Sequence, residues 1–193
     1  MRIGIDLRRL SGEALVTAAR KADQRGLWAV LVGGPAGTEA TTAAQLAVET
    51  DHIHLAMWIA AESAHPHTLA EEIAVVDQLS QRRSLAVIDG DSDTASQVRD
   101  LLAGHIVHGA VLAPPPAQTA VPVWLAAETT IVSLRGELAP DQAAVDQLRD
   151  SGHTHIFVQW PGPLSTLARH LATRAAGPGF PQIVADQADI IAP

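Results

Sequence analysis

The sequence predicts an α/β fold of the (β/α) barrel type, shortened by about one strand–helix unit after the fifth strand. Apolar strand segments alternate with helical segments, which is typical of right-handed βαβ units in a parallel sheet. Hydrophobic residues make up 47% of the chain and aromatic residues only 3%, so the core is built from Ala, Val, Leu and Ile. The length of 193 residues falls short of the about 250 that a complete eight-stranded barrel needs.

The first half of the chain has the most regular pattern. Strands are predicted at 2–6, 28–32, 53–60 and 85–88. Helices follow them at 15–22, 41–50, 66–80 and 95–102, where Ala and Leu recur at helical spacing. Gly26 is a plausible helix stop, and Gly33-Gly34-Pro35 ends the second strand. Four such units without a Rossmann glycine fingerprint favour a barrel over an open sheet.

The middle of the chain breaks this rhythm. Residues 113–120 contain three consecutive prolines and are predicted to form an extended connector. Strands are expected at 121–127 and 131–134, with almost no linker between them. Because neighbouring parallel strands need a crossover of about a dozen residues, these two strands either form a hairpin or mark the deletion of a helical unit.

The alternation of strands and helices resumes at residue 140. A helix is predicted at 140–149, a strand at 155–159, and a final helix that carries Leu164, Leu167, Ala168 and Leu171. About seven strands result, one fewer than a full barrel. Residues 1–193 are taken as a single domain whose tail, about 177–193, is expected to pack loosely against it.

Composition excludes several classes of function. The formal net charge is −8 and no basic stripe exists, which argues against nucleic-acid binding. The absence of cysteine excludes disulfides, thiolate metal sites and a Cys nucleophile. No apolar run approaches the roughly 18 residues of a membrane span, and the charged N-terminus is not that of a signal peptide. A cytoplasmic protein without a membrane partner is expected.

Several short motifs resemble one known family in their order and spacing. They are Ala19 and Ala22 leading to Gly26-Leu27-Trp28; Thr50 with Ile53-His54-Leu55; His65-Pro66 through Leu69-Ala70-Glu71-Glu72 to Asp77-Gln78-Leu79-Ser80 and Arg83; and Val121-Pro122-Val123-Trp124. This order resembles the bacterial-luciferase-like flavin- or deazaflavin-dependent oxidoreductases, of which the chain would be a truncated member. The segment from His65 to Arg83 is the most specific match.

The resemblance implies a TIM-like barrel that holds FMN or a deazaflavin coenzyme at the C-terminal ends of its strands. The implied activity is that of an oxidoreductase or monooxygenase acting on a small organic substrate. The flavin ring would perform the chemistry, while the protein binds, orients and excludes water. The implied assembly is a homodimer, or a heterodimer with a full-length luciferase-like protein.

Departures from the family pattern support a second hypothesis. Positions that usually carry glycine, or small residues beside the flavin ring, here hold Met57, Trp58, Arg82, Val87, Asp89, Asp91, Ala126 and Ala127. The helix–strand–helix unit after the fifth strand is also missing. The alternative is therefore a catalytically degenerate relative that serves as a partner subunit or as a small-ligand binder.

Residues at the C-terminal ends of the predicted strands are the candidate site residues, because function sits there in barrels. The predicted cofactor-binding residues are Arg8, Gly33, Gly34, Trp58, Arg135 and Trp160, and the predicted catalytic residue is His65. For Trp58 the alternative is that it fills the top of the barrel, and for His65 that it bonds locally at a helix entry. The same rim holds Asp6, Glu62, Asp89, Asp91 and Glu128, which repel a phosphate.

Two His-x-His pairs, His52/His54 and His153/His155, raise the question of a metal site. Residues i and i+2 of a strand point the same way, so each pair could chelate a metal ion. Both pairs precede their strands, however, which places them at the N-terminal face of the barrel, where residues serve stability. No metal is therefore predicted.

Overall fold

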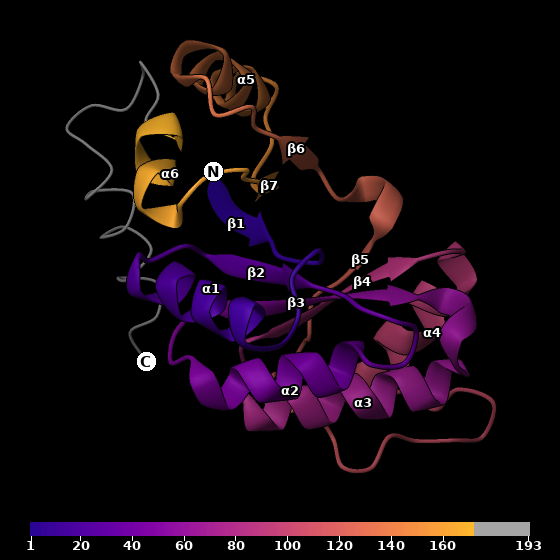
Figure 1. The fold of residues 1–193 in the computed structure, drawn as a ribbon. Coiled ribbons are helices and arrows are strands. Elements are labelled where there is room, and N and C mark those ends of the chain that lie inside the picture. Colours follow the sequence, from indigo (N-terminus) through magenta and orange to yellow (C-terminus); the bar gives the residue numbers. More distant parts are fainter. Residues whose placement is uncertain (172–193) are drawn as a thin grey trace.

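The computed structural model describes residues 1–171, so the predicted tail 177–193 lies outside the described residues. All seven described strands join one parallel sheet in the order β5-β4-β3-β2-β1-β7-β6 (Figure 1). The strands are β1 (Arg2–Asp6), β2 (Ala29–Val32), β3 (His54–Ala60), β4 (Ser84–Asp89), β5 (Val123–Leu125), β6 (Ile131–Ser133) and β7 (His155–Gln159).

Helices cover the outside of this sheet. They are α1 (Gly12–Gln24), α2 (Glu39–Glu49), α3 (Pro66–Leu79), α4 (Ser92–Leu102), α5 (Leu138–Asp150) and α6 (Leu164–Leu171), with short 3₁₀ turns η1 (Ala61–Ser63) and η2 (Ala126–Glu128). None of the helices within residues 1–171 is long and apolar enough to cross a membrane.

The sheet is curled into an incomplete cylinder. β5 and β6 are its two edge strands, yet they follow each other in the chain. The six steps from Leu125 to Ile131 reach at most about 22 Å. A flat sheet of seven strands would hold its edges about 29 Å apart at a spacing of about 4.8 Å. The predicted shortened barrel is confirmed, and it is open along a seam between β5 and β6.

The seam also decides between the two alternatives for the middle of the chain. β5 pairs in parallel with β4, and β6 pairs in parallel with β7, so the two strands form no hairpin. The predicted strand 121–127 is shorter than expected because Ala126–Glu128 turn into η2. The predicted helix 140–149 begins earlier, at Leu138, since Pro140 is tolerated in the first turn of a helix.

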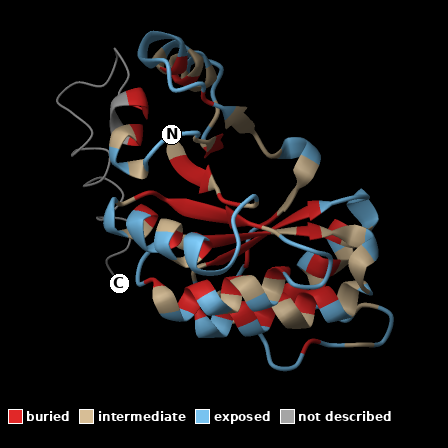
Figure 2. Cartoon of the chain, in the orientation of Figure 1, coloured by how far each residue is buried: buried red, intermediate tan, exposed pale blue. Residues whose placement is uncertain are grey.

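Alternation along the strands produces two cores. Figure 2 shows that most of the residues in the central strands are buried. The larger core lies between the sheet and the helices and includes Ile3, Ile5 and Leu55. The smaller core lies on the opposite, concave face, inside the cylinder, and consists of Trp28, Ala29, Leu31, Ala56, Leu85, Val87 and Phe157, with Trp58 and Trp124 packed against it.

Gly4 makes room for the Phe157 ring in the smaller core, which is called the inner core below. A Cβ atom at Gly4 would lie 2.6 Å from two ring atoms of Phe157 and 3.0 Å from the carbonyl oxygen of Ala29. Only glycine therefore lets the Phe157 ring cross β1 and fill the cylinder.

Asp77, from the most specific family motif, holds the proline-rich connector in place. Its carboxylate is fully buried and accepts hydrogen bonds from Ser84 Oγ (2.8 Å), the Gln118 backbone N–H (2.7 Å) and Gln118 Nε2 (2.6 Å). The neighbouring Gln78 Nε2 donates to the carbonyl of Pro115 (2.6 Å). These bonds join α3, β4 and the connector.

Arg83, the last residue of the same motif, holds the C-terminal end of α2. Its guanidinium donates to Ser80 O (2.7 Å), Thr50 Oγ1 (3.0 Å), Ile53 O (3.0 Å), Ala47 O (2.8 Å) and Thr50 O (2.9 Å). Burial lowers the pKa of Arg83 from its usual value, while Asp23 and Asp51 partly oppose this shift. The motif that carries the family resemblance thus stabilises the scaffold.

Candidate functional site

A polar network crosses the C-terminal mouth of the cylinder. Ser133 Oγ donates to Gln159 Oε1 (2.6 Å), and Gln159 Nε2 donates to Asp6 Oδ2 (2.9 Å). Arg8 reaches the same carboxylate through Nε to Oδ1 (2.9 Å) and Nη2 to Oδ2 (2.8 Å). These contacts connect the C-terminal ends of β6, β7 and β1.

Arg8 also stacks on Trp58. Its guanidinium carbon lies 4.1 Å from the centre of the Trp58 ring, in cation–π geometry. Trp58 Nε1 in turn donates to Asp89 Oδ2 (3.0 Å), at the end of β4. The network therefore continues over β3 and β4, and the chain's own side chains lie across the mouth.

The Asp6 carboxylate is the centre of this network. Its side chain is 3% exposed and accepts bonds from the backbone N–H and the guanidinium of Arg8 and from Gln159. Burial raises the pKa of Asp6, but the hydrogen bonds from Arg8 and Gln159 outweigh that effect, so its pKa is lowered overall. Arg8 and Gln159 thus already occupy the hydrogen-bonding positions of the charged Asp6 carboxylate.

Other side chains of the protein occupy the space beside three glycines near the mouth. A Cβ at Gly33 would lie 3.2 and 3.3 Å from Cγ and Cδ of Arg8, and one at Gly34 would lie 2.7 Å from Thr38 Oγ1. At Gly90 a Cβ would lie 2.3 Å from the Cβ of Ala61. These glycines admit side chains of the protein itself and leave no cradle for a phosphate or a ring.

The predicted site residues divide into two groups. Arg8, Gly33 and Trp58 come together at the mouth, with Gly34 beside Thr38. Arg135 is exposed beyond β6, and its backbone N–H donates to Asp141 Oδ1 (2.8 Å).

Trp160 and His65 make local contacts. Trp160 Nε1 donates to Pro163 O (3.0 Å), and its ring centre lies 4.4 Å from that of His170 in α6. His65 is the N-cap of α3, and its Nδ1 accepts the backbone N–H of His67 (3.3 Å).

The donor set at the mouth does not fit a flavin cofactor. A phosphate needs cations and free N–H groups, whereas Arg8 is paired with Asp6, and Asp89 and Asp91 lie at the same end of the sheet. A planar ring would need the face of Trp58 that the Arg8 guanidinium covers.

In each histidine pair the second member begins a strand, β3 for His54 and β7 for His155, and only the first member precedes it. His52 is exposed, whereas His54 and His155 are partly buried against Trp28, with ring centres 5.7 and 4.8 Å from it. Within residues 1–171 one group of side chains could hold a metal ion: Asp23, Asp51 and His52. The Asp23 carboxylate already accepts the backbone N–H groups of Asp51, His52 and Ile53, so it caps the turn before β3.

Acid is expected to destabilise the protein through His54 and His155. Burial lowers the pKa of both imidazoles from 6.5, and the charge of Arg2 lowers both further; for His54 the hydrogen bond with the Arg83 carbonyl partly opposes the shift. The unfolded chain therefore binds more protons below about pH 6.5, and the free energy of unfolding falls as the pH drops.

Urea unfolding at about pH 7.5 and about pH 5.5 measures this loss. His54→Gln is expected to reduce the loss, and His52→Gln, at an exposed position, to leave it unchanged. Equal pH dependence in all three proteins would contradict the assignment.

Comparisons with known proteins support the fold. No protein-family model matches the sequence, and no curated protein matches it significantly. In structure the chain is similar to the monooxygenase RslO1 from Streptomyces bottropensis, with a TM-score of 0.54 and 18% identity over 98% of this chain and 66% of that one. It is also similar to the coenzyme F420 dependent tetrahydromethanopterin reductase from Methanopyrus kandleri, with a TM-score of 0.56 and 15% identity over 82% of this chain and 65% of that one.

A third similar structure contains a flavin. It is the oxygenating constituent of 3,6-diketocamphane monooxygenase from Pseudomonas putida, a type II Baeyer–Villiger monooxygenase in complex with FMN, with a TM-score of 0.53 and 14% identity over 98% of this chain and 62% of that one. This chain thus spans about two thirds or less of the length of these neighbours. The predicted likeness to luciferase-like barrels is confirmed at the level of the fold.

Proposed function

We propose that this protein is a catalytically degenerate luciferase-like barrel, which serves as a small-ligand binder or as a partner subunit of a full-length luciferase-like protein. The observation that carries the proposal is the Arg8 guanidinium, stacked on Trp58 and bonded twice to Asp6. A flavin or deazaflavin ring at the mouth would have to displace it.

Displacement has a large energetic cost. The Asp6 side chain is 3% exposed, so removal of Arg8 leaves a buried carboxylate without its cation. Breaking such a pair costs about 3 kcal/mol, which weakens a competing ligand about 100-fold. The proposed consequence is that the mouth binds no flavin at physiological concentrations.

The flavin- or deazaflavin-dependent oxidoreductase remains the second candidate function. It is favoured by the fold shared with flavin- and coenzyme F420 dependent enzymes. In that case a bound flavin would supply hydride transfer or oxygen activation to a small organic substrate, Trp58 would contact the ring, and His65 would move a proton.

A titration of the purified protein with FMN and with a deazaflavin distinguishes the two functions. We expect no saturable change in flavin absorbance or fluorescence at tens of micromolar. Saturable binding that is lost in Trp58→Ala but kept in Trp160→Ala would overturn the proposal that the mouth binds no flavin and would favour the oxidoreductase. Trp160 is the matched control because its contacts lie toward α6.

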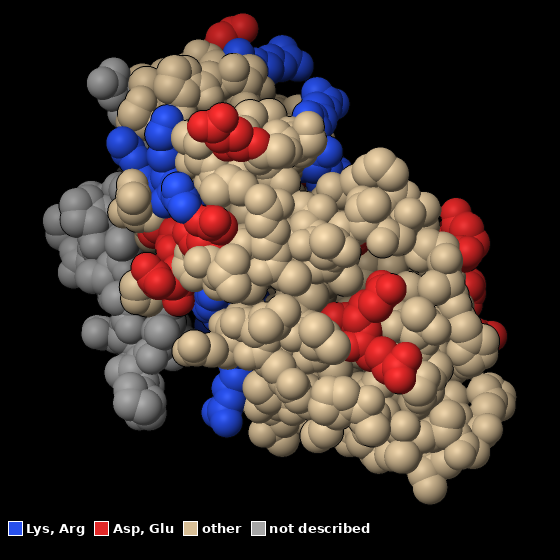
Figure 3. Space-filling model, turned by 60° about the horizontal axis from the view of Figure 1, so that its bottom comes forward, with Lys and Arg blue, Asp and Glu red and all other residues tan. Residues whose placement is uncertain are grey.

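A dimer through α2 and α3 is part of the same proposal. Exposed apolar side chains on these helices are Val48 (73%), Val75 (44%) and Leu79 (49%). Figure 3 shows that most of this face is uncharged, with a few carboxylates. Light scattering is expected to give the mass of a dimer, and Val75→Glu combined with Leu79→Glu that of a monomer. A monomeric unmodified protein would restrict the proposal to a heterodimer or a ligand binder.

A further inference from the structure

A cavity lies at the seam, away from the mouth of the cylinder. Its lining residues include Trp124 of β5, Glu128 of η2, Thr130, His153 and His155. Thr130 directly precedes β6 and His155 begins β7, so the cavity lies toward the N-terminal ends of these strands, whereas the mouth is at their C-terminal ends. The volume of about 480 Å³ is within the range of about 300–1,000 Å³ that is typical of small-molecule pockets.

Aromatic rings form part of the cavity wall. Trp124 and His155 are both partly exposed, and their ring centres lie 5.3 Å apart. Trp28 does not line the cavity, but it stacks on Trp124 with ring centres 5.8 Å apart and so holds the Trp124 indole in place. An indole ring offers apolar surface to an aromatic ligand, and its face attracts a cation more strongly than other aromatic side chains do.

The polar side chains of the cavity offer hydrogen-bond acceptors. The Glu128 carboxylate is exposed, and it makes no hydrogen bond or ion pair with any other residue within 1–171. His153 Nδ1 lies 3.0 Å from the carbonyl oxygen of Leu148. Because a carbonyl oxygen can only accept, Nδ1 carries the proton of the neutral imidazole, which leaves His153 Nε2 as an acceptor. These groups match a ligand that donates hydrogen bonds.

Charge favours a cationic ligand. Among the described residues, those that line the cavity include one carboxylate and no lysine or arginine. The formal net charge of −8 also attracts cations to the protein as a whole. Burial and the nearby Arg2 lower the pKa of His155, so this imidazole is neutral near pH 7 and does not repel a cation. Since Arg2 itself disfavours a positive charge beside His155, the cationic end of the ligand is expected at Glu128.

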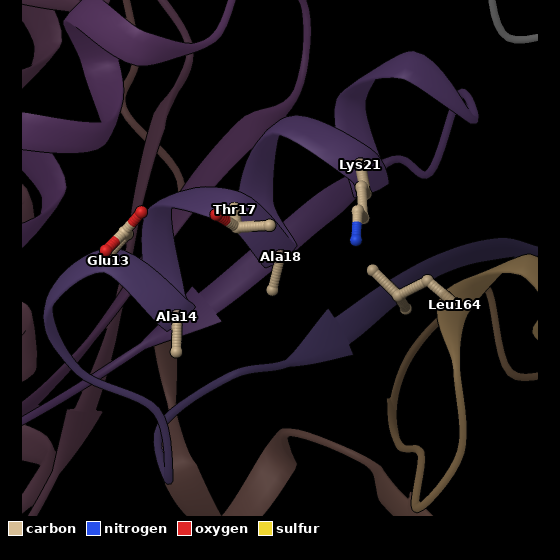
Figure 4. A pocket seen from close by; sticks show the side chains of 6 residues that line it. All are labelled: Glu13, Ala14, Thr17, Ala18, Lys21 and Leu164. Atoms are coloured by element: carbon tan, nitrogen blue, oxygen red, sulfur yellow. The ribbon is translucent and has the colours of Figure 1, made fainter.

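The other described hollow lacks this combination of groups. It has a volume of about 510 Å³ and lies between α1 and Leu164 of α6. Figure 4 shows short side chains of α1, with Glu13 and Lys21 toward its two ends. No aromatic ring is among the described residues that line it, and the charge of Lys21 balances that of Glu13.

We infer that the seam cavity binds a small organic amine in its protonated form, with an aromatic group attached to the ammonium by a short linker. The aromatic group packs against Trp124 and His155, and the ammonium donates to the Glu128 carboxylate. His153 Nε2 remains as an acceptor for a further polar group of the ligand. None of the residues of the mouth network lines the cavity, so the inference holds whether or not the mouth binds a flavin.

Three fluorinated probes of similar shape test the charge of the ligand. At about pH 7.5, 4-fluorobenzylamine is a cation, 4-fluorobenzyl alcohol is neutral and 4-fluorobenzoate is an anion. Fluorine NMR titration of the full chain is expected to show that the amine binds about 2–5-fold more tightly than the alcohol, the range that an exposed ion pair provides, and that the benzoate binds most weakly. No binding of the amine at millimolar concentration, or an affinity for the alcohol or the benzoate that equals that for the amine, would overturn the inference.

Three variants assign the binding to the cavity. Glu128→Gln keeps the shape of the side chain without its charge, so the amine and the alcohol are expected to bind it equally. Glu13→Gln removes the carboxylate of the other hollow and is expected to leave the preference for the amine unchanged. Trp124→Ala is expected to abolish binding of both probes. A preference that survives Glu128→Gln or is lost in Glu13→Gln, or binding that survives Trp124→Ala, would contradict the assignment.

A measurement on the unmodified protein covers the case in which Trp124→Ala does not fold. The four tryptophans of the chain give separate indole N–H signals in a nitrogen-15 spectrum. The amine is expected to shift the signal of Trp124 and to leave those of Trp58 and Trp160 in place. An unchanged Trp124 signal at saturating amine would place the ligand elsewhere and overturn the inference.

Discussion

Arg83→Met is expected to lower the free energy of unfolding by about 3–4 kcal/mol. The guanidinium donates five hydrogen bonds, and four of its acceptor groups are backbone carbonyls at the end of α2, before β3 and at the end of α3. Methionine keeps much of the stem volume but leaves these carbonyls without a donor. Urea unfolding followed by circular dichroism measures the change.

Two further variants control this measurement. Arg82→Met removes an exposed arginine at the adjacent position and is expected to change stability by less than about 0.5 kcal/mol. Arg83→Lys keeps the charge but cannot reproduce the planar set of donors, so an intermediate loss is expected. A loss in Arg83→Met no larger than that in Arg82→Met would show that the bonds contribute little.

Gly4→Ala is expected to destabilise the protein by about 2–3 kcal/mol because it overpacks the inner core. The added methyl group would lie 2.6 Å from two ring atoms of Phe157, whose side chain is 1% exposed. On one side the Phe157 ring packs against Trp28, whose ring centre lies 5.9 Å from its own. Thermal and urea unfolding measure the loss.

A double-mutant cycle identifies the cause. Phe157→Leu removes the ring atoms that the methyl group meets, so Gly4→Ala is expected to cost less in the Phe157→Leu background. The same cost in both backgrounds would assign the loss to the carbonyl oxygen of Ala29, which lies 3.0 Å from the added atom.

Most of the fold could be predicted from the sequence because its patterns are local. The strands 2–6 and 155–159 were predicted at their observed bounds, since apolar runs between turn residues mark buried parallel strands. The helix predicted at 66–80 ends one residue earlier, at Leu79. The seam between β5 and β6 could not be derived, because two strands adjacent in the chain become opposite edges only through the curvature of the whole sheet.

The site was less accessible to sequence reasoning. The pattern placed Asp6, Arg8, Trp58 and Asp89 at the C-terminal ends of strands, where the structure has them. That Arg8 turns back onto Asp6 and covers Trp58 depends on side-chain conformations, which periodicity does not encode.

The ring contacts among Trp28, Trp124 and His155 were not predicted. Trp28, Trp124 and His155 come from distant parts of the chain. Trp28 precedes β2 at the centre of the sheet, whereas Trp124 and His155 lie in β5 and β7, so only the curling of the sheet brings the three rings together.

The brevity of β5 and β6 has a consequence for solubility. Each of these border strands is three residues long, so each offers only a very short row of unpaired amide and carbonyl groups. A long exposed border would recruit strands from other molecules into fibrous aggregates. This gapped cylinder therefore gives foreign polypeptides little template to extend, and its opening can persist without inviting polymerisation.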